Sequence, residues 1–170
     1  MSKQQLHAKL DAIFNAHVQA ELAGDLDETL ATMVPNPHLV NVPTMVGGQG
    51  PQGVRTFYSK RLIGQFFPPD VMFETISRTY SEERLVDELI ISFTHTIRMD
   101  HILPGIEPTG RRVEAVFVVI VGIEDDKVAY EHILWDQASV LVQLGLLDPK
   151  GLPVVGEGAA AKLRHPALPD

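Results

Sequence analysis

Cysteine is absent from the 170 residues, which excludes disulfide bonds, thiolate nucleophiles and metal sites with cysteine ligands. An excess of basic charge is also missing, because the formal net charge is −8 and the basic residues are scattered. This charge balance does not favour binding to nucleic acid or to an anionic membrane. The longest apolar run, AVFVVIVGI (115–123), is far shorter than the ~20 residues of a membrane-spanning helix. The polar start of the chain lacks a secretory signal, so we expect a cytoplasmic protein.

What remains is an ordinary globular composition, with 45% hydrophobic and 21% charged residues. A chain of this length buries a sizeable core as a single domain. We interpret residues 1–148 as one α+β domain and residues 149–170 as its C-terminal tail, mostly loop.

The hydrophobic period changes along the chain from helical to strand-like. Apolar residues recur at helical spacing in the first 66 residues, and alternate from Asp70 onward. Helices before a series of hairpin-connected strands indicate an α+β fold. We therefore predict a cone-shaped, curved, mostly antiparallel sheet with the N-terminal helices on its concave face, around an apolar pocket. The expected helices are 3–23, 26–33, 54–66 and 138–147, and the expected strands are 71–80, 84–101, 111–123 and 127–136.

Several segments of the second half carry a family resemblance: LPGIEPTGRRVE (103–114) and the apolar strand after it, the turn DDK (125–127), and EHILWDQ (131–137) before a helix that ends VLVQLGLL. In these features the chain resembles the SnoaL-like polyketide cyclases of the nuclear-transport-factor-2-like, or ketosteroid isomerase-like, superfamily. The resemblance implies a homodimer, no metal, no organic cofactor, and a carboxylate at the base of the pocket that maps onto Asp136. One departure is that the strand beside Asp136 is wholly apolar, which argues against polyketide cyclisation itself.

Asp136 has two interpretations. It precedes an apolar helix and is a preferred N-cap residue there. It can also act as the acid/base of a dry pocket, where burial opposes the helix dipole in setting its protonation. The sequence leaves both open.

The expected pocket face follows from strand alternation. His132, Leu134 and Asp136 share one face, although His132 and Asp136 are ~13 Å apart along a straight strand. His95 lies on the expected strand 84–101, on the far side of the apolar strand that neighbours Asp136. We expect it to supply Asp136 with a partner or to orient the substrate. We expect Phe93, Phe117, Tyr58 and, at the mouth, His38 to line the pocket beside Leu134.

The opposite face of the last strand carries Glu131 and Trp135, which we expect on the outer sheet surface, buried against a homodimer partner. If the faces are inverted, Glu131 becomes the pocket carboxylate, because a one-residue slip moves every side chain to the other face.

The leading hypothesis is a cofactor-free acid/base enzyme, of cyclase, isomerase or lyase type, acting on a hydrophobic carbonyl-bearing small molecule. Asp136, His132 and His95 would be its catalytic residues. A non-catalytic ligand-binding or dimerisation module is the alternative. Histidine spacings do not predict a metal site, and an epoxide hydrolase needs two aspartates bridged by an arginine, which Arg98 with Asp100 and Asp136 fits poorly.

Overall fold

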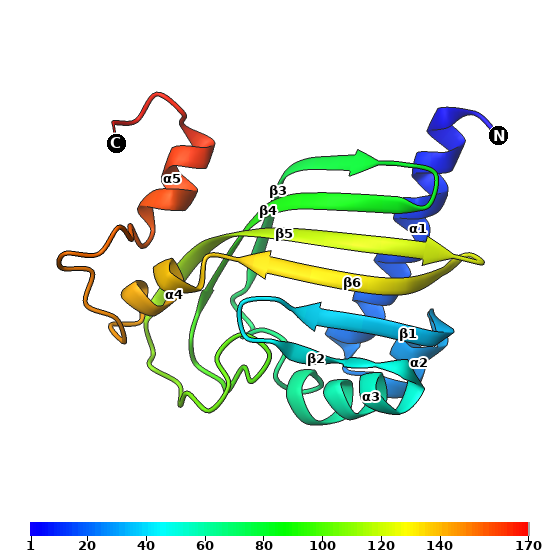
Figure 1. Ribbon diagram of the computed structural model, residues 1–170, viewed down its shortest axis with the longest axis horizontal. Helices are drawn as coiled ribbons and strands as arrows, with labels where there is room; N and C mark the ends of the chain where they lie inside the picture. The colour runs from blue at the N-terminus through cyan, green and yellow to red at the C-terminus, as the bar shows by residue number, and fades with distance from the viewer. Residues whose placement is uncertain (170) are drawn as a thin grey trace.

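The computed structural model describes residues 1–169 and shows one curved, six-stranded sheet with the order β2-β1-β6-β5-β4-β3. Neighbouring strands are antiparallel except for the parallel pair β1 and β6, and α1 crosses behind the sheet (Figure 1). The predicted α+β cone is thus confirmed. The strands are β1 (Met33–Asn41), β2 (Val46–Gln49), β3 (Met72–Tyr80), β4 (Arg84–Thr94), β5 (Arg112–Glu124) and β6 (Lys127–Trp135). The helices are α1 (Lys3–Ala23), α2 (Leu26–Ala31), α3 (Gly50–Phe57), the π-helical turn η1 (Tyr58–Leu62), α4 (Gln137–Gln143) and α5 (Gly158–Arg164).

The long helix α1 has defined ends and one buried stripe. Ser2 and Gln5 form a reciprocal capping box at its start, and Gly24 ends it in the left-handed conformation at φ 71°. Leu10 and Phe14 are buried in a core with residues of η1 and of the concave sheet face. Burial of this stripe holds α1 across the sheet, because packing of an amphipathic face supplies most of a helix's stability.

The hairpin of β5 and β6 sets which side chains face the concave side. Asp125 and Asp126 form its two-residue turn with positive φ angles of 48° and 60°. The pairing then shifts by one residue, since Ile123 faces Val128 whereas Gly122 faces Tyr130. This irregularity is a β-bulge, with one extra residue on β6. Beyond it, the odd-numbered residues of β6 lie on the concave side.

Several predicted boundaries move. The helix expected over 54–66 is α3 followed by η1, and the strand expected to reach residue 101 ends at Thr94. β1 and β2 lie almost wholly between the helices expected over 26–33 and 54–66. The tail contains α5, whose Arg164 forms a paired contact with Glu114 on the outer face of β5. The division into a domain and a tail stays a prediction.

None of the helices in residues 1–169 is long and apolar enough to cross a membrane.

Candidate active site

A cavity of about 310 Å³ lies between α1, η1 and the concave face of the sheet. This volume is at the lower end of the range of small-molecule sites. Most of its wall is apolar and includes Leu39, Phe66, Phe117, Val119 and Ile133. The titratable side chains in its wall are few, and they are Glu21, Tyr58, Arg78, Asp87, His101 and Glu131.

Four buried polar side chains meet at one side of this cavity, and Glu21, Tyr58 and Glu131 among them line it. His17 and Glu21 come from α1, Tyr58 from η1, and Glu131 from β6. The His17 Nε2 atom lies 3.1 Å from the Tyr58 hydroxyl, 3.3 Å from Glu131 Oε2 and 3.5 Å from Glu21 Oε1. The Tyr58 hydroxyl also donates to Glu131 Oε2 over 3.4 Å. We call these four residues the acid/base cluster.

The imidazole of His17 is held in place from its other nitrogen. Thr32 donates its hydroxyl hydrogen to the Thr29 carbonyl, so the Thr32 oxygen accepts from His17 Nδ1–H over 2.6 Å. Burial by itself lowers the pKa of His17, but the Glu131 and Glu21 carboxylates outweigh burial and raise that pKa to about 10. At neutral pH His17 is therefore an imidazolium whose Nε2–H points at the two glutamates.

The two glutamates differ in their surroundings. Burial raises the pKa of Glu21, and the nearby Glu131 charge raises it further, while His17 opposes both effects. Burial also raises the pKa of Tyr58 well above its ordinary value, which keeps the phenol protonated. The charged His17 contacts both glutamates and offsets part of the cost of burying them. The cluster thus places Glu21, whose pKa is raised, beside the second carboxyl group of Glu131.

The same side chains could hold a metal ion. Ligand atoms of His17, Glu21 and Glu131 all lie within 4.8 Å of one another. His17 Nδ1 donates to Thr32, as metal-bound histidines commonly do to an outer partner. A metal would have to displace the proton on Nε2, however, and the raised pKa of His17 makes that costly at neutral pH. Proton transfer suits the observed contacts better.

A second polar group lines the cavity at β3 and β4. Arg78 binds the Asp87 carboxylate through Nε and Nη2, and its Nη1 donates to Asp11 of α1 over 2.7 Å. The Tyr80 hydroxyl donates to the same Asp11. These contacts tie α1 to the edge of the sheet and leave a guanidinium at the cavity wall.

Two of the predicted pocket residues lie in the cavity wall. Tyr58 is buried there as part of the acid/base cluster, and Phe117 stacks on Trp135 with ring centroids 5.4 Å apart. Phe93 is buried on the same side of the sheet and packs against Phe67, outside the lining. Trp135, expected on the outer surface, is also a core residue.

The predicted catalytic face is inverted. Asp136 is exposed, lies outside the cavity lining and caps α4, accepting from the Ser139 amide over 3.1 Å and from its hydroxyl over 2.6 Å. His132 and Leu134 lie on the convex face, where His132 Nε2 is 3.2 Å from His38 Nε2. The bulge in β6 is the physical reason, because one extra residue reverses the facing of every later side chain.

His95 also lies away from its expected position. His95 lies just past the end of β4, fully buried, with Nδ1 3.3 Å from the Thr109 hydroxyl, and it does not reach the cavity. Burial lowers its pKa. Arg98 binds Asp100 and Glu107 at the surface, which agrees with the poor fit of these residues to an epoxide-hydrolase site.

Sequence reasoning missed His17 and Glu21, although a signal existed. With Leu10 and Phe14 they continue the apolar stripe of α1, and all four are buried. Charged residues on such a stripe are rarely buried unless they are paired. Glu131 was expected in the pocket only under the inverted alternative, and it lines the cavity.

No protein-family model and no curated protein matches this chain. Solved structures do resemble it. AclR from Streptomyces galilaeus, a hydroxylase candidate, is 22% identical with a TM-score of 0.60, covering 83% of this chain and 87% of that one. IdmH from Streptomyces antibioticus, a polyketide cyclase candidate, is 17% identical with a TM-score of 0.59, covering 79% and 97%. SalBIII, an epoxide hydrolase/cyclase-like enzyme of polyether salinomycin pyran-ring formation, is 15% identical with a TM-score of 0.56, covering 80% and 95%.

Likeness at these identities concerns the fold. A protein with a ketosteroid isomerase-like fold from Catenulispora acidiphila also aligns, at 10% identity and a TM-score of 0.58. The sheet order, the concave-side helices and these alignments agree with the predicted fold. The chain has the nuclear-transport-factor-2-like cone fold, which ketosteroid isomerase-like proteins and polyketide cyclase candidates share.

Proposed function

We propose that this protein is a cofactor-free acid/base enzyme that moves a proton on a hydrophobic, carbonyl-bearing small molecule. The observation that carries the proposal is the buried cluster of His17, Glu21, Tyr58 and Glu131 at the wall of an apolar cavity. Such sites pair a proton acceptor with a proton donor whose protonation is set by burial and by neighbouring charge.

The arrangement supports enolisation. The Glu131 carboxylate takes a proton from the carbon next to the carbonyl, so a C–H bond breaks and an O–H bond forms on Glu131. Glu21, whose raised pKa favours the protonated form, gives its hydrogen to the carbonyl oxygen, which completes the enol without a net change in charge. His17 and Tyr58 hold Glu131 in place through their hydrogen bonds. The enol can then be reprotonated at another carbon or attack a second carbonyl, as isomerases and cyclases require.

A non-catalytic small-molecule-binding module is the second candidate. It is supported by the contacts within the cluster, because His17, Tyr58 and Glu131 already have hydrogen-bond partners in the protein. In that case the cluster stabilises the cone and the cavity only holds a ligand.

Deuterium exchange separates the two candidates. We expect the protein to accelerate exchange of the α-hydrogens of 2-tetralone in deuterated buffer at neutral pD, followed by proton NMR, because general acid–base catalysis contributes typically ~10²–10⁴-fold. A chelator should leave this rate unchanged, and loss of activity with chelator would favour the metal alternative. Binding of 2-tetralone without any acceleration would refute the enzyme.

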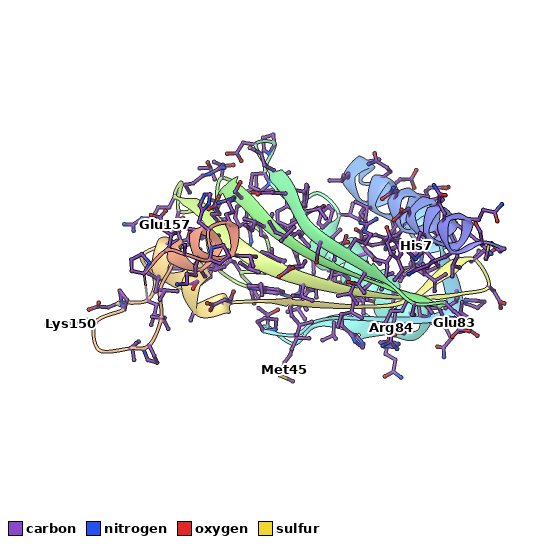
Figure 2. The ribbon with its side chains drawn as sticks, turned by 90° about the horizontal axis from the view of Figure 1, so that it is seen from above. His7, Met45, Glu83, Arg84, Lys150 and Glu157 are labelled. Carbon is purple, nitrogen blue, oxygen red and sulfur yellow. The ribbon has the colours of Figure 1, made fainter. Side chains whose placement is uncertain are left out.

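We further propose that the chain forms a homodimer through the convex face of the sheet. Figure 2 shows that Arg84 and Met45 point away from α1 on this face. Next to Arg84, Tyr130 and His132 form a stacked, partly exposed aromatic pair with ring centroids 4.8 Å apart. Sedimentation should give the mass of a dimer, and Tyr130→Glu should shift it toward the monomer. A monomeric wild type would contradict this proposal.

A further inference from the structure

His101 is a second, separate polar group in the cavity wall. It lies in the loop after β4. A hydrogen bond from the Thr44 hydroxyl to the His101 carbonyl, 3.0 Å long, holds this loop in place. Its side chain is 3% exposed, lines the cavity, and lies against the rings of Phe66 and Phe67 at centroid distances of 5.9 and 5.7 Å. A histidine with these neighbours has an aromatic surface on two sides.

Neither ring nitrogen of His101 has a hydrogen-bond partner within residues 1–169. The Arg61 carbonyl is close enough to favour the charged ring slightly, but it lacks the geometry of a hydrogen bond. The contrast with His17, whose two nitrogens are both bonded, is sharp. Buried polar groups are nearly always satisfied, so an orphaned imidazole at a cavity wall indicates that its partner comes from outside the protein.

The substrate must also suit the space between His101 and the acid/base cluster. The intervening lining is apolar and includes Phe117 and Ile133. Ile133 is two residues along β6 from Glu131, which corresponds to ~7 Å. A flat fused-ring body fills such a space, and the aromatic side chains at its His101 end favour stacking.

We propose that His101 is the second polar anchor of the cavity and selects flat aromatic substrates that carry a neutral oxygen, hydroxyl or carbonyl, at each end. This inference rests on the proposed function, which places one of the two oxygens, the first, beside Tyr58 and Glu21 of the acid/base cluster. A neutral imidazole offers one donor and one acceptor, so a hydroxyl satisfies it in either tautomer. Burial lowers the pKa of His101 to about 3, so the ring stays uncharged at neutral pH and does not favour a carboxylate.

Two matched probes test this anchor: 2,6-dihydroxynaphthalene, with an oxygen at each end, and 2-naphthol, which lacks the second oxygen. We expect wild type to bind the diol about tenfold more tightly by fluorescence titration, the effect of one buried neutral hydrogen bond. His101→Phe should abolish this preference while 2-naphthol still binds, and His101→Gln should restore part of it. In wild type, the imidazole nitrogen NMR signals of His101 should shift with the diol and stay in place with 2-naphthol.

An unchanged preference in His101→Phe, an unshifted His101 signal, or failure of both probes to bind would overturn the anchor. Tyr58→Phe separates this result from the proposed function. It should weaken both probes equally and leave their ratio unchanged. If Tyr58→Phe has no effect while His101→Phe removes the preference, the anchor stands and the assignment of the first oxygen to the acid/base cluster fails.

Discussion

Replacing Glu131 with glutamine is expected to lower the rate of 2-tetralone deuteration by about two orders of magnitude or more. Glutamine keeps the shape of the side chain and its contact with Tyr58, but an amide cannot accept a proton from carbon. The remaining Glu21 carboxyl is the proposed proton donor, and one carboxyl group cannot take over both roles in the same step. Proton NMR of the exchanging ketone measures the effect directly.

The matched control is Asp136→Asn. Asp136 is a carboxylate on the same β6–α4 segment, but it is exposed and caps α4 instead of facing the cavity. The Asp136→Asn variant should deuterate 2-tetralone at the wild-type rate. Wild type, Glu131→Gln and Asp136→Asn should all bind 2-tetralone with similar affinity. Wild-type turnover in Glu131→Gln would remove Glu131 from the mechanism, and a loss confined to Asp136→Asn would restore the original assignment.

The architecture was predictable because it depends on long-range averages of the sequence. Helical spacing over α1, alternation over β4 and the apolar run of β5 persist for many residues, so single irregularities do not change the class of fold. Phe117 was placed correctly because β5 runs without a bulge from Arg112 to Gly122.

The facing of β6 was not predictable by alternation, because one bulge reverses it. Gly122 is the residue that could have indicated the bulge. It faces Tyr130, and a Cβ atom at Gly122 would lie 2.0 Å from the Tyr130 ring. An isolated glycine in an apolar strand is typical of a bulge or of a close approach. With this one shift, Glu131 moves inward and His132 outward.

The acid/base cluster has a second reason for escaping prediction. Its members are separated by as many as 114 residues, and contacts between α1 and β6 depend on how the helix crosses the sheet. Only the position of His17 and Glu21 on the buried stripe of α1 is visible locally. Their meeting with Glu131 is a property of packing, which hydrophobic periodicity does not encode.

Removal of His17 should have the largest effect on stability. His17→Leu leaves the Glu21 and Glu131 carboxylates buried without their cation, and breaking a buried ion pair in this way costs ~3–5 kcal/mol. Urea unfolding at neutral pH measures the loss. His165→Leu, at an exposed histidine, is the matched control and should unfold like wild type.

The pH dependence of this loss identifies its cause. Because the pKa of His17 is raised from 6.5 to about 10 on folding, its contribution is fully present below pH 6.5 and is lost as the pH rises toward 10. His17→Leu lacks that decline. The variant instead loses stability as the pH rises above the ordinary glutamate range, since burial raises the pKa of Glu21 and His17 is no longer present to oppose that shift. The difference in unfolding free energy between wild type and variant should therefore be largest near neutral pH and smaller on both sides. A difference that is constant with pH would mean that His17 acts through packing alone and that its charge does not hold the cluster together.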